Sequence, residues 1–189
     1  MSARRFVVVA AVLALGVALF FPLLVSSTGH PPADYCLHNI RMLGLSLIQY
    51  AVDHEGRLPD SFGDLLKQGY LTTTRCFICP SSSAKVPADF PWDYKSADVK
   101  VLSTADNWSS YAIVKGVTLE GKLKLVILYE KTPAHLYREV RHLASSWWGR
   151  RFGKFPDDTP GRFCAFSDGH VEWLPEAKFQ ERMKKQRPR

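Results

Sequence analysis

The chain lacks several patterns that would assign it to a common class. None of its 189 residues form a Gly-x-Ser-x-Gly sequence, which excludes the nucleophile elbow of an α/β-hydrolase. The body has no basic patch interleaved with aromatic residues, so nucleic acid is not an expected partner. The roughly 160 residues that follow the N-terminal apolar run suit one domain and are too few for two.

Most of the chain has almost no net charge, because the net charge of +7 is concentrated at the ends. The segment 175–189, predicted to be a basic C-terminal helix and tail, has a net charge of +4. Arg4 and Arg5 add +2, which leaves +1 for everything between. We expect this distribution to favour contact with an anionic membrane or envelope polymer.

No charged residue interrupts the apolar run from Phe6 to Val25. Its length is about that of a helix crossing a bilayer. Because Arg4 and Arg5 precede it, the positive-inside bias places Met1 in the cytoplasm. The sequence therefore predicts a single-pass protein of the inner (cytoplasmic) membrane, with its N-terminus inside and its domain extracytoplasmic, or periplasmic.

This prediction divides the chain into residues 1–29, a cytoplasmic stub and transmembrane anchor, and residues 30–189, the extracytoplasmic domain. A cleaved signal peptide is the alternative, because Ser27-Thr28-Gly29 provides small residues for a peptidase. The apolar run is longer than the roughly 7–15 residues of a signal-peptide core, which favours the anchor.

Cysteine is scarce, with four residues in the chain: Cys36, Cys76, Cys79 and Cys164. In an exported protein all four are disulfide candidates, and four cysteines allow three pairings among which the sequence cannot choose. The Cys76-x-x-Cys79 spacing also suits a redox dithiol or half of a zinc site. A structural disulfide is the favoured interpretation, because no second cysteine pair completes a zinc site and Pro80 indicates a loop.

Hydrophobic periodicity predicts an α+β domain. Helices are expected at Asp34–His54, at Phe62–Gln68 and after Pro175, with strands at Ser110–Val114 and Leu123–Tyr129. Little regular structure is expected from residue 72 to about residue 106, and residues 136–145 are a candidate helix.

The clearest local signal is a hairpin between Arg162 and Leu174, because Asp168-Gly169 suits a two-residue turn. With that turn, Phe166 faces Val171, and Cys164 faces Trp173. All four side chains would then lie on one side of the sheet.

Four blocks of the sequence together resemble the type II secretion pseudopilin-like proteins that end in an Asp-Gly-His-Val hairpin. The blocks are CLHNIRMLGLSLIQYAVDHEGRLPDSFGDLLKQGYL (Cys36 to Leu71), CFICPSS (Cys76 to Ser82), YEKTPAH (Tyr129 to His135) and FCAFSDGHVEWL (Phe163 to Leu174). The resemblance implies a type IV pilin-like fold, in which an N-terminal transmembrane helix continues into a long helix packed on a small antiparallel sheet. It implies a structural component of an envelope assembly, no enzymatic activity, and partners that are pilin-like subunits, secretion-assembly proteins and the membrane.

The chain departs from this family at two places. Arg5-Phe6-Val7-Val8-Val9 lacks both the small residue at which family members are cleaved and the glutamate near the start of their apolar helix, so prepilin-peptidase cleavage is not predicted. The segment 136–161 is an insertion relative to the family. Within it, Trp147, Trp148, Arg150 and Arg151 form a candidate partner-binding or membrane-interface patch, since tryptophan and arginine are enriched at both. Burial of the two tryptophans in a small core is equally compatible.

Glu130, His135, Asp168 and His170 form a candidate metal site, because the first two leave a strand and the second two form the hairpin turn, which could bring all four to one edge of the sheet. Since the resemblance includes pseudopilins that bind calcium, calcium is the cation considered. The favoured interpretation is nevertheless that Asp168 is a turn residue, His170 its exposed neighbour, and no cofactor is required.

Two other functions stay open beside the assembly role. One is a stand-alone exported module that binds an envelope ligand or partner through the inserted segment. The other is an exported thiol-redox protein centred on Cys76 and Cys79.

Overall fold

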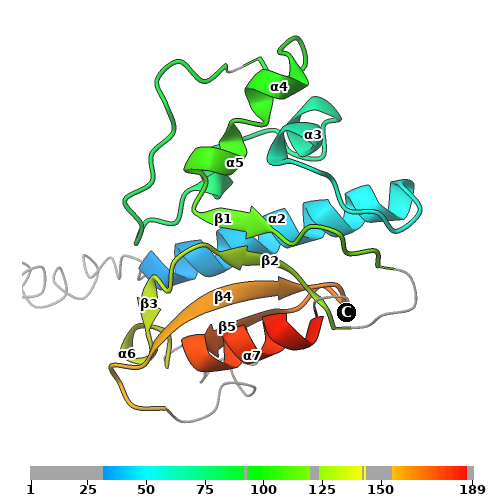
Figure 1. Ribbon diagram of the computed structural model, residues 1–189. Coiled ribbons are helices and arrows are strands. Elements are labelled where there is room, and N and C mark those ends of the chain that lie inside the picture. Colours follow the sequence, from blue (N-terminus) through cyan, green and yellow to red (C-terminus); the bar gives the residue numbers. More distant parts are fainter. Residues whose placement is uncertain (1–31, 92, 120–123, 142, 144–154, 187–189) are drawn as a thin grey trace, which may run out of the picture. The chain divides into compact units, whose positions relative to one another are not determined.

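A computed structural model describes residues 32–91, 93–119, 124–141, 143 and 155–186 (Figure 1). Within this part, the chain is an α+β domain with a small antiparallel sheet, as predicted, and the sheet has five strands. The apolar run 6–25 lies outside the described residues, so the predicted anchor stays a prediction. None of the described helices is long and apolar enough to cross a membrane.

Helix α2, Pro32–Asp53, corresponds to the predicted helix at 34–54. Its buried side chains recur every three or four residues, which places them on the face toward the sheet: Cys36, Ile40, Leu43, Leu47 and Ala51. Gly44 allows close approach, because a Cβ there would lie 2.8 Å from the Cβ of Ala165. The helix ends where Glu55 and Gly56 adopt positive φ angles.

The segment between α2 and the sheet holds several short helices. α3, Phe62–Lys67, confirms the predicted second helix and begins at a capping box between Ser61 and Asp64. It is followed by η1 (Arg75–Phe77), α4 (Val99–Leu102) and α5 (Ala105–Trp108). The last three were not expected, because turns of three or four residues are too short to show periodicity.

The strands are β1 (Tyr111–Ile113), β2 (Val126–Glu130), β3 (His135–Leu136), β4 (Pro160–Phe166) and β5 (Val171–Pro175). β4 is central: β5 pairs with residues 161–165 along one edge, so β2 and β3 must share the other edge. β1 extends the sheet beyond β2. β1 lies within the predicted strand 110–114, and β2 overlaps the predicted strand 123–129 and ends one residue after it.

The hairpin forms as predicted, but its register is wrong by one residue. Ala165 pairs with Val171 and Phe163 with Trp173, which leaves a three-residue loop, 167–169. Gly169 has a φ of 83°, and Phe166 donates its backbone N–H to the carbonyl of His170 across the loop. A glycine in the left-handed region at the end of a three-residue loop is a common alternative to the two-residue turn.

This register assigns the side chains of β4 to two faces. Phe163 and Ala165 join the core beneath α2, whereas Cys164 and Phe166 join a smaller core beneath α7, Glu176–Gln186. α7 confirms the helix predicted after Pro175, and Figure 1 shows it across the sheet from α2. In the inserted segment, α6 spans Tyr137–Val140, a single turn within the predicted 136–145 helix.

Candidate functional site

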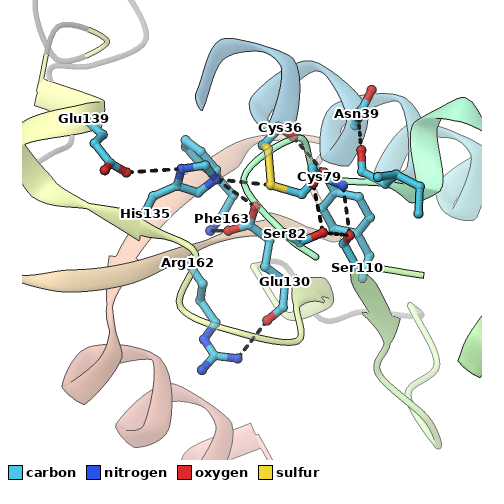
Figure 2. A network of polar contacts seen from close by, with 12 residues as sticks. Cys36, Asn39, Cys79, Ser82, Ser110, Glu130, His135, Glu139, Arg162 and Phe163 are labelled. Carbon is cyan, nitrogen blue, oxygen red and sulfur yellow. Dashed lines mark hydrogen bonds and ion pairs between the residues drawn. A yellow bond between two sulfur atoms is a disulfide. The ribbon is translucent and has the colours of Figure 1, made fainter. Parts of the chain in front are cut away.

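The most unusual feature of the α2 face is a cluster of polar and sulfur-containing side chains at 0–1% exposure (Figure 2). It comprises Cys36, Cys79, Glu130 and His135. One sulfur, nitrogen or carboxylate oxygen atom from each lies within 4.8 Å of the others. Buried polar groups require partners, so the contacts of each member define what the cluster can do.

Cys36 and Cys79 form a disulfide across a sequence separation of 43 residues. Cys36 lies near the start of α2, and Cys79 lies just after η1. The loop around Cys79 is also held by hydrogen bonds, from Asn39 Nδ2 to the carbonyl of Ile78 (2.8 Å) and from the Cys79 N–H to Ser110 Oγ (2.9 Å). The disulfide therefore joins the beginning of the long helix to the segment that leads into the sheet.

Glu130 occupies the gap between β2 and β3 on one edge of β4. Its Oε2 accepts a hydrogen bond from the backbone N–H of Phe163 (2.8 Å), which pairs with neither β2 nor β3 in the strand register. Its Oε1 lies 3.2 Å from His135 Nε2. The carboxylate thus accepts the hydrogen bond that a neighbouring strand's carbonyl would otherwise accept from Phe163, and its second oxygen faces the histidine.

His135 begins β3 and packs against the ring of Phe163, with ring centroids 5.1 Å apart. Its Nε2 faces both Glu130 and the sulfur of Cys79, at 3.5 Å from the latter. Its Nδ1 is buried without a hydrogen-bond partner among the described residues, and the nearest carboxylate is Glu139 Oε2 at 3.7 Å. The imidazole therefore spans the space between the disulfide and the surface.

On the opposite face of the sheet, Arg162 holds the end of β2 in place. Its guanidinium donates to the carbonyl oxygens of Glu130 (2.7 Å) and Lys131 (3.1 Å), and it forms an ion pair with Glu176 of α7. It also lies 4.3 Å above the ring of Phe179. Arg162 and Glu176 were not predicted from the sequence. An arginine in an apolar strand does not reveal which backbone carbonyls will need a donor, because that depends on how the strands pair.

The two remaining cysteines are buried free thiols. Burial raises the pKa of Cys76 to about 12 and raises the pKa of Cys164 well above its usual value, so both resist ionisation. The structure therefore forms one disulfide from the four candidates. The Cys76-x-x-Cys79 pair is neither a disulfide nor a low-pKa dithiol, because Cys79 is bonded to Cys36.

Of the four predicted metal ligands, the structure brings Glu130 and His135 together and leaves Asp168 and His170 elsewhere. His135 pairs with Gly161 at the start of β4, whereas the hairpin turn follows Phe166 at the other end of that strand. Asp168 and His170 instead contact each other, and the His170 ring stacks on Phe166 at 4.2 Å. The predicted four-residue site is thus corrected, because the two pairs lie at opposite ends of one strand.

The candidate patch of Trp147, Trp148, Arg150 and Arg151 lies outside the described residues and stays a prediction. In the oxidised chain, the described cluster is a covalent link beside a buried His–Glu pair, and disulfide sulfurs carry no thiolate to bind a metal ion. Comparison of the chain with protein-family models, with characterised proteins and with solved structures gives no significant match.

Proposed function

We propose that this chain is a membrane-anchored, pseudopilin-like structural component of a type II secretion or type IV pilus-like envelope assembly. The observation that carries the proposal is the two-sided character of α2. One side is buried against the sheet, and the other carries exposed apolar side chains at Leu45 (51% exposed) and Val52 (72% exposed). In the sequence, this helix follows the predicted anchor after only a few residues.

Leu45 and Val52 are seven residues apart, two helical turns, and therefore lie on the same side of α2. Because each side chain is already partly buried, its complete burial would stabilise an interface by only about 1–2 kcal/mol, which is too little for assembly in free solution. An anchor that confines the chains to a membrane raises their effective concentration, so weak helix contacts become sufficient.

A rigid mount for α2 also supports an assembly role. The close approach of Gly44 to Ala165 and the Cys36–Cys79 disulfide fix the helix to the rest of the domain. The disulfide is typical of an oxidising, extracytoplasmic compartment. The exposed side of the helix is thereby held in one orientation toward a neighbour.

Cysteine cross-linking in membranes tests the proposal. Cys76 and Cys164 are buried and the other two cysteines are bonded, so an introduced surface cysteine is the reactive one. We expect Leu45→Cys to give covalent dimers with a bifunctional maleimide, because each chain then offers one reactive thiol. Val101→Cys is the matched control, because Val101 is also an exposed apolar residue (47%) but lies on α4. Equal cross-linking of both variants, or none at position 45, contradicts the proposal.

A stand-alone binding module is the second candidate, and a cleft of about 240 Å³ between β5 and α7 favours it. Acidic, basic and apolar side chains line this cleft: Phe166, Glu172, Leu174, Lys178, Glu181, Arg182 and Lys185. If the chain is a binding module, Leu45→Cys should stay monomeric in membranes. A ligand present in soluble envelope extracts should then occupy the cleft and protect Lys178 and Lys185 from amine labelling.

A further inference from the structure

We propose that the buried cluster becomes a zinc site when the Cys36–Cys79 disulfide is reduced. The ligands would be the two thiolates, Nε2 of His135 and Oε1 of Glu130. This inference goes beyond the assembly role and does not depend on it. It also differs from the calcium site considered from the sequence, because only Glu130 and His135 are common to both.

The spacing of the donor atoms is close to that of a tetrahedral zinc site. Zinc bonds to sulfur, nitrogen and oxygen correspond to ligand-to-ligand separations of about 3.3–3.8 Å. His135 Nε2 already lies 3.2 Å from Glu130 Oε1 and 3.5 Å from the sulfur of Cys79. The separation that must change most is that of the two sulfurs, and breaking their bond allows them to move apart to van der Waals contact.

The contacts around the ligands are those that a metal centre requires. Zinc-binding histidines usually direct their second ring nitrogen at a carboxylate, and ligating carboxylates are usually hydrogen-bonded. Here His135 Nδ1 faces Glu139 Oε2 at 3.7 Å, and Glu130 Oε2 accepts from the Phe163 N–H. Both ligands are therefore oriented before any metal binds, and Nδ1, which has no hydrogen-bond partner in the described part of the chain, gains a role.

The chemistry balances with an external dithiol as reductant. The dithiol transfers two electrons and two protons to the protein disulfide and becomes a disulfide itself, leaving two thiols at Cys36 and Cys79. Zinc then replaces the two thiol protons, which are released to solvent as two Zn–S bonds form. Two sulfur ligands and one imidazole favour zinc over calcium, which prefers an all-oxygen set.

The other two cysteines provide an internal control. Cys76 donates to the carbonyl of Thr73, and Cys164 lies in the core on the α7 face, so neither belongs to the cluster. A full-length Cys76→Ala/Cys164→Ala variant leaves Cys36 and Cys79 as the only thiols. Any zinc bound through sulfur must then be bound by these two residues.

The experiment uses this variant in detergent. A dithiol reduces the protein and is then removed under anaerobic conditions. We expect one zinc ion per reduced chain by metal analysis and none per oxidised chain. We also expect cobalt to give the absorption of a tetrahedral thiolate site. Zinc should protect both thiols from alkylation. Absence of zinc from the reduced chain, or equal binding to the oxidised chain, overturns the proposal, as does zinc retained after Cys36→Ser/Cys79→Ser.

Three further substitutions in the same background test the other contacts. His135→Gln and Glu130→Gln should each weaken zinc binding by more than about 100-fold, as expected for lost ligands. Their folding is checked by whether the Cys36–Cys79 disulfide forms again in air. Glu139→Gln changes a half-exposed residue with little risk to folding, and should weaken binding about 10- to 100-fold. Unchanged affinity in all three variants contradicts the assigned ligand set.

Discussion

Strand β4 contributes side chains to both faces of the sheet, but the two faces are stabilised in different ways. On the α2 face, β4 contributes to a large core that includes a disulfide and a fully buried His–Glu pair. On the α7 face, it contributes to a small core bordered by the ion pair of Arg162 with Glu176, whose carboxylate side chain is 30% exposed. The covalent link and a fully buried carboxylate therefore lie on one face, whereas the ion pair on the other face joins a buried arginine to a carboxylate that water can reach.

The difference follows from how much apolar surface each helix covers. α2 has 22 residues, whereas α7 has 11 and buries a single residue, Phe179. A polar group beneath a short helix stays close to water and can be solvated there. Beneath a long helix it must find a protein partner, so a substitution on the α2 face should cost more than a matched one on the α7 face.

The largest expected effect is loss of the disulfide. Cys36→Ala/Cys79→Ala should reduce the free energy of unfolding by about 4 kcal/mol, because the bond closes a loop of 43 residues in the unfolded chain. Urea unfolding of the oxidised full-length protein in detergent measures this difference.

Cys164→Ala is the matched control, because it removes a buried sulfur from the α7 face without opening a loop. It should cost about 1 kcal/mol, near the transfer free energy of a small buried group. If both variants lose the same stability, the contrast between the two faces does not hold.

A smaller effect is expected for the buried carboxylate. Glu130→Ala removes the partners of the Phe163 N–H and of His135 Nε2, and should cost about 3 kcal/mol, since each unpaired buried group costs about 1–3 kcal/mol. Glu176→Ala on the other face should cost only about 1 kcal/mol. Arg162 keeps its two carbonyl acceptors and gains access to water there. Chemical unfolding of both variants gives the comparison, and equal losses would contradict it.

The smallest effect concerns the free thiols in alkaline solution. Burial raises the pKa of Cys76 from 9.0 to about 12, so the folded chain keeps the thiol protonated while the unfolded chain ionises. The contribution to stability is intact below pH 9 and decreases as pH rises toward 12, by about 1.4 kcal/mol at pH 10.

Cys76→Ala should therefore flatten the decline of stability between pH 8 and pH 10, as measured by urea unfolding. Cys164→Ala should flatten it too, because burial raises the pKa of that thiol on the opposite face. Here the faces should behave alike, since exclusion of water is the dominant cause for both thiols. A decline that neither substitution changes would show that other groups dominate it.

Local patterns predicted much of the fold. The helix at 34–54 shows a regular apolar stripe, and α3 lies between the turn residues Leu58–Ser61 and Gly69, so both were recognisable. The hairpin was also predicted, but its register was wrong. Asp168-Gly169 suits a two-residue turn, yet a three-residue loop places Trp173 and Phe163 beneath α2. Burial of these large rings selects the register, and burial is a property of the assembled core.

The site was predicted only in part. Glu130 and His135 were selected because they follow a predicted strand, and the structure places them 3.2 Å apart. Their predicted companions, Asp168 and His170, lie at the far end of β4, since the sequence did not reveal that β3 pairs with the start of that strand. The partner of each cysteine was equally hidden, because residues 36 and 79 meet only through the packing of α2 on the loop.

The sequence by itself determined the α+β class, the long helix, the final helix and the set of residues capable of chemistry. These depend on periodicity, capping and turn residues, which act over a few positions along the chain. Only the tertiary structure decided the hairpin register, the choice of one disulfide among four cysteines, and the gathering of Cys36, Cys79, Glu130 and His135. Those outcomes depend on which segments exclude water together, and distant segments meet only once the core has formed.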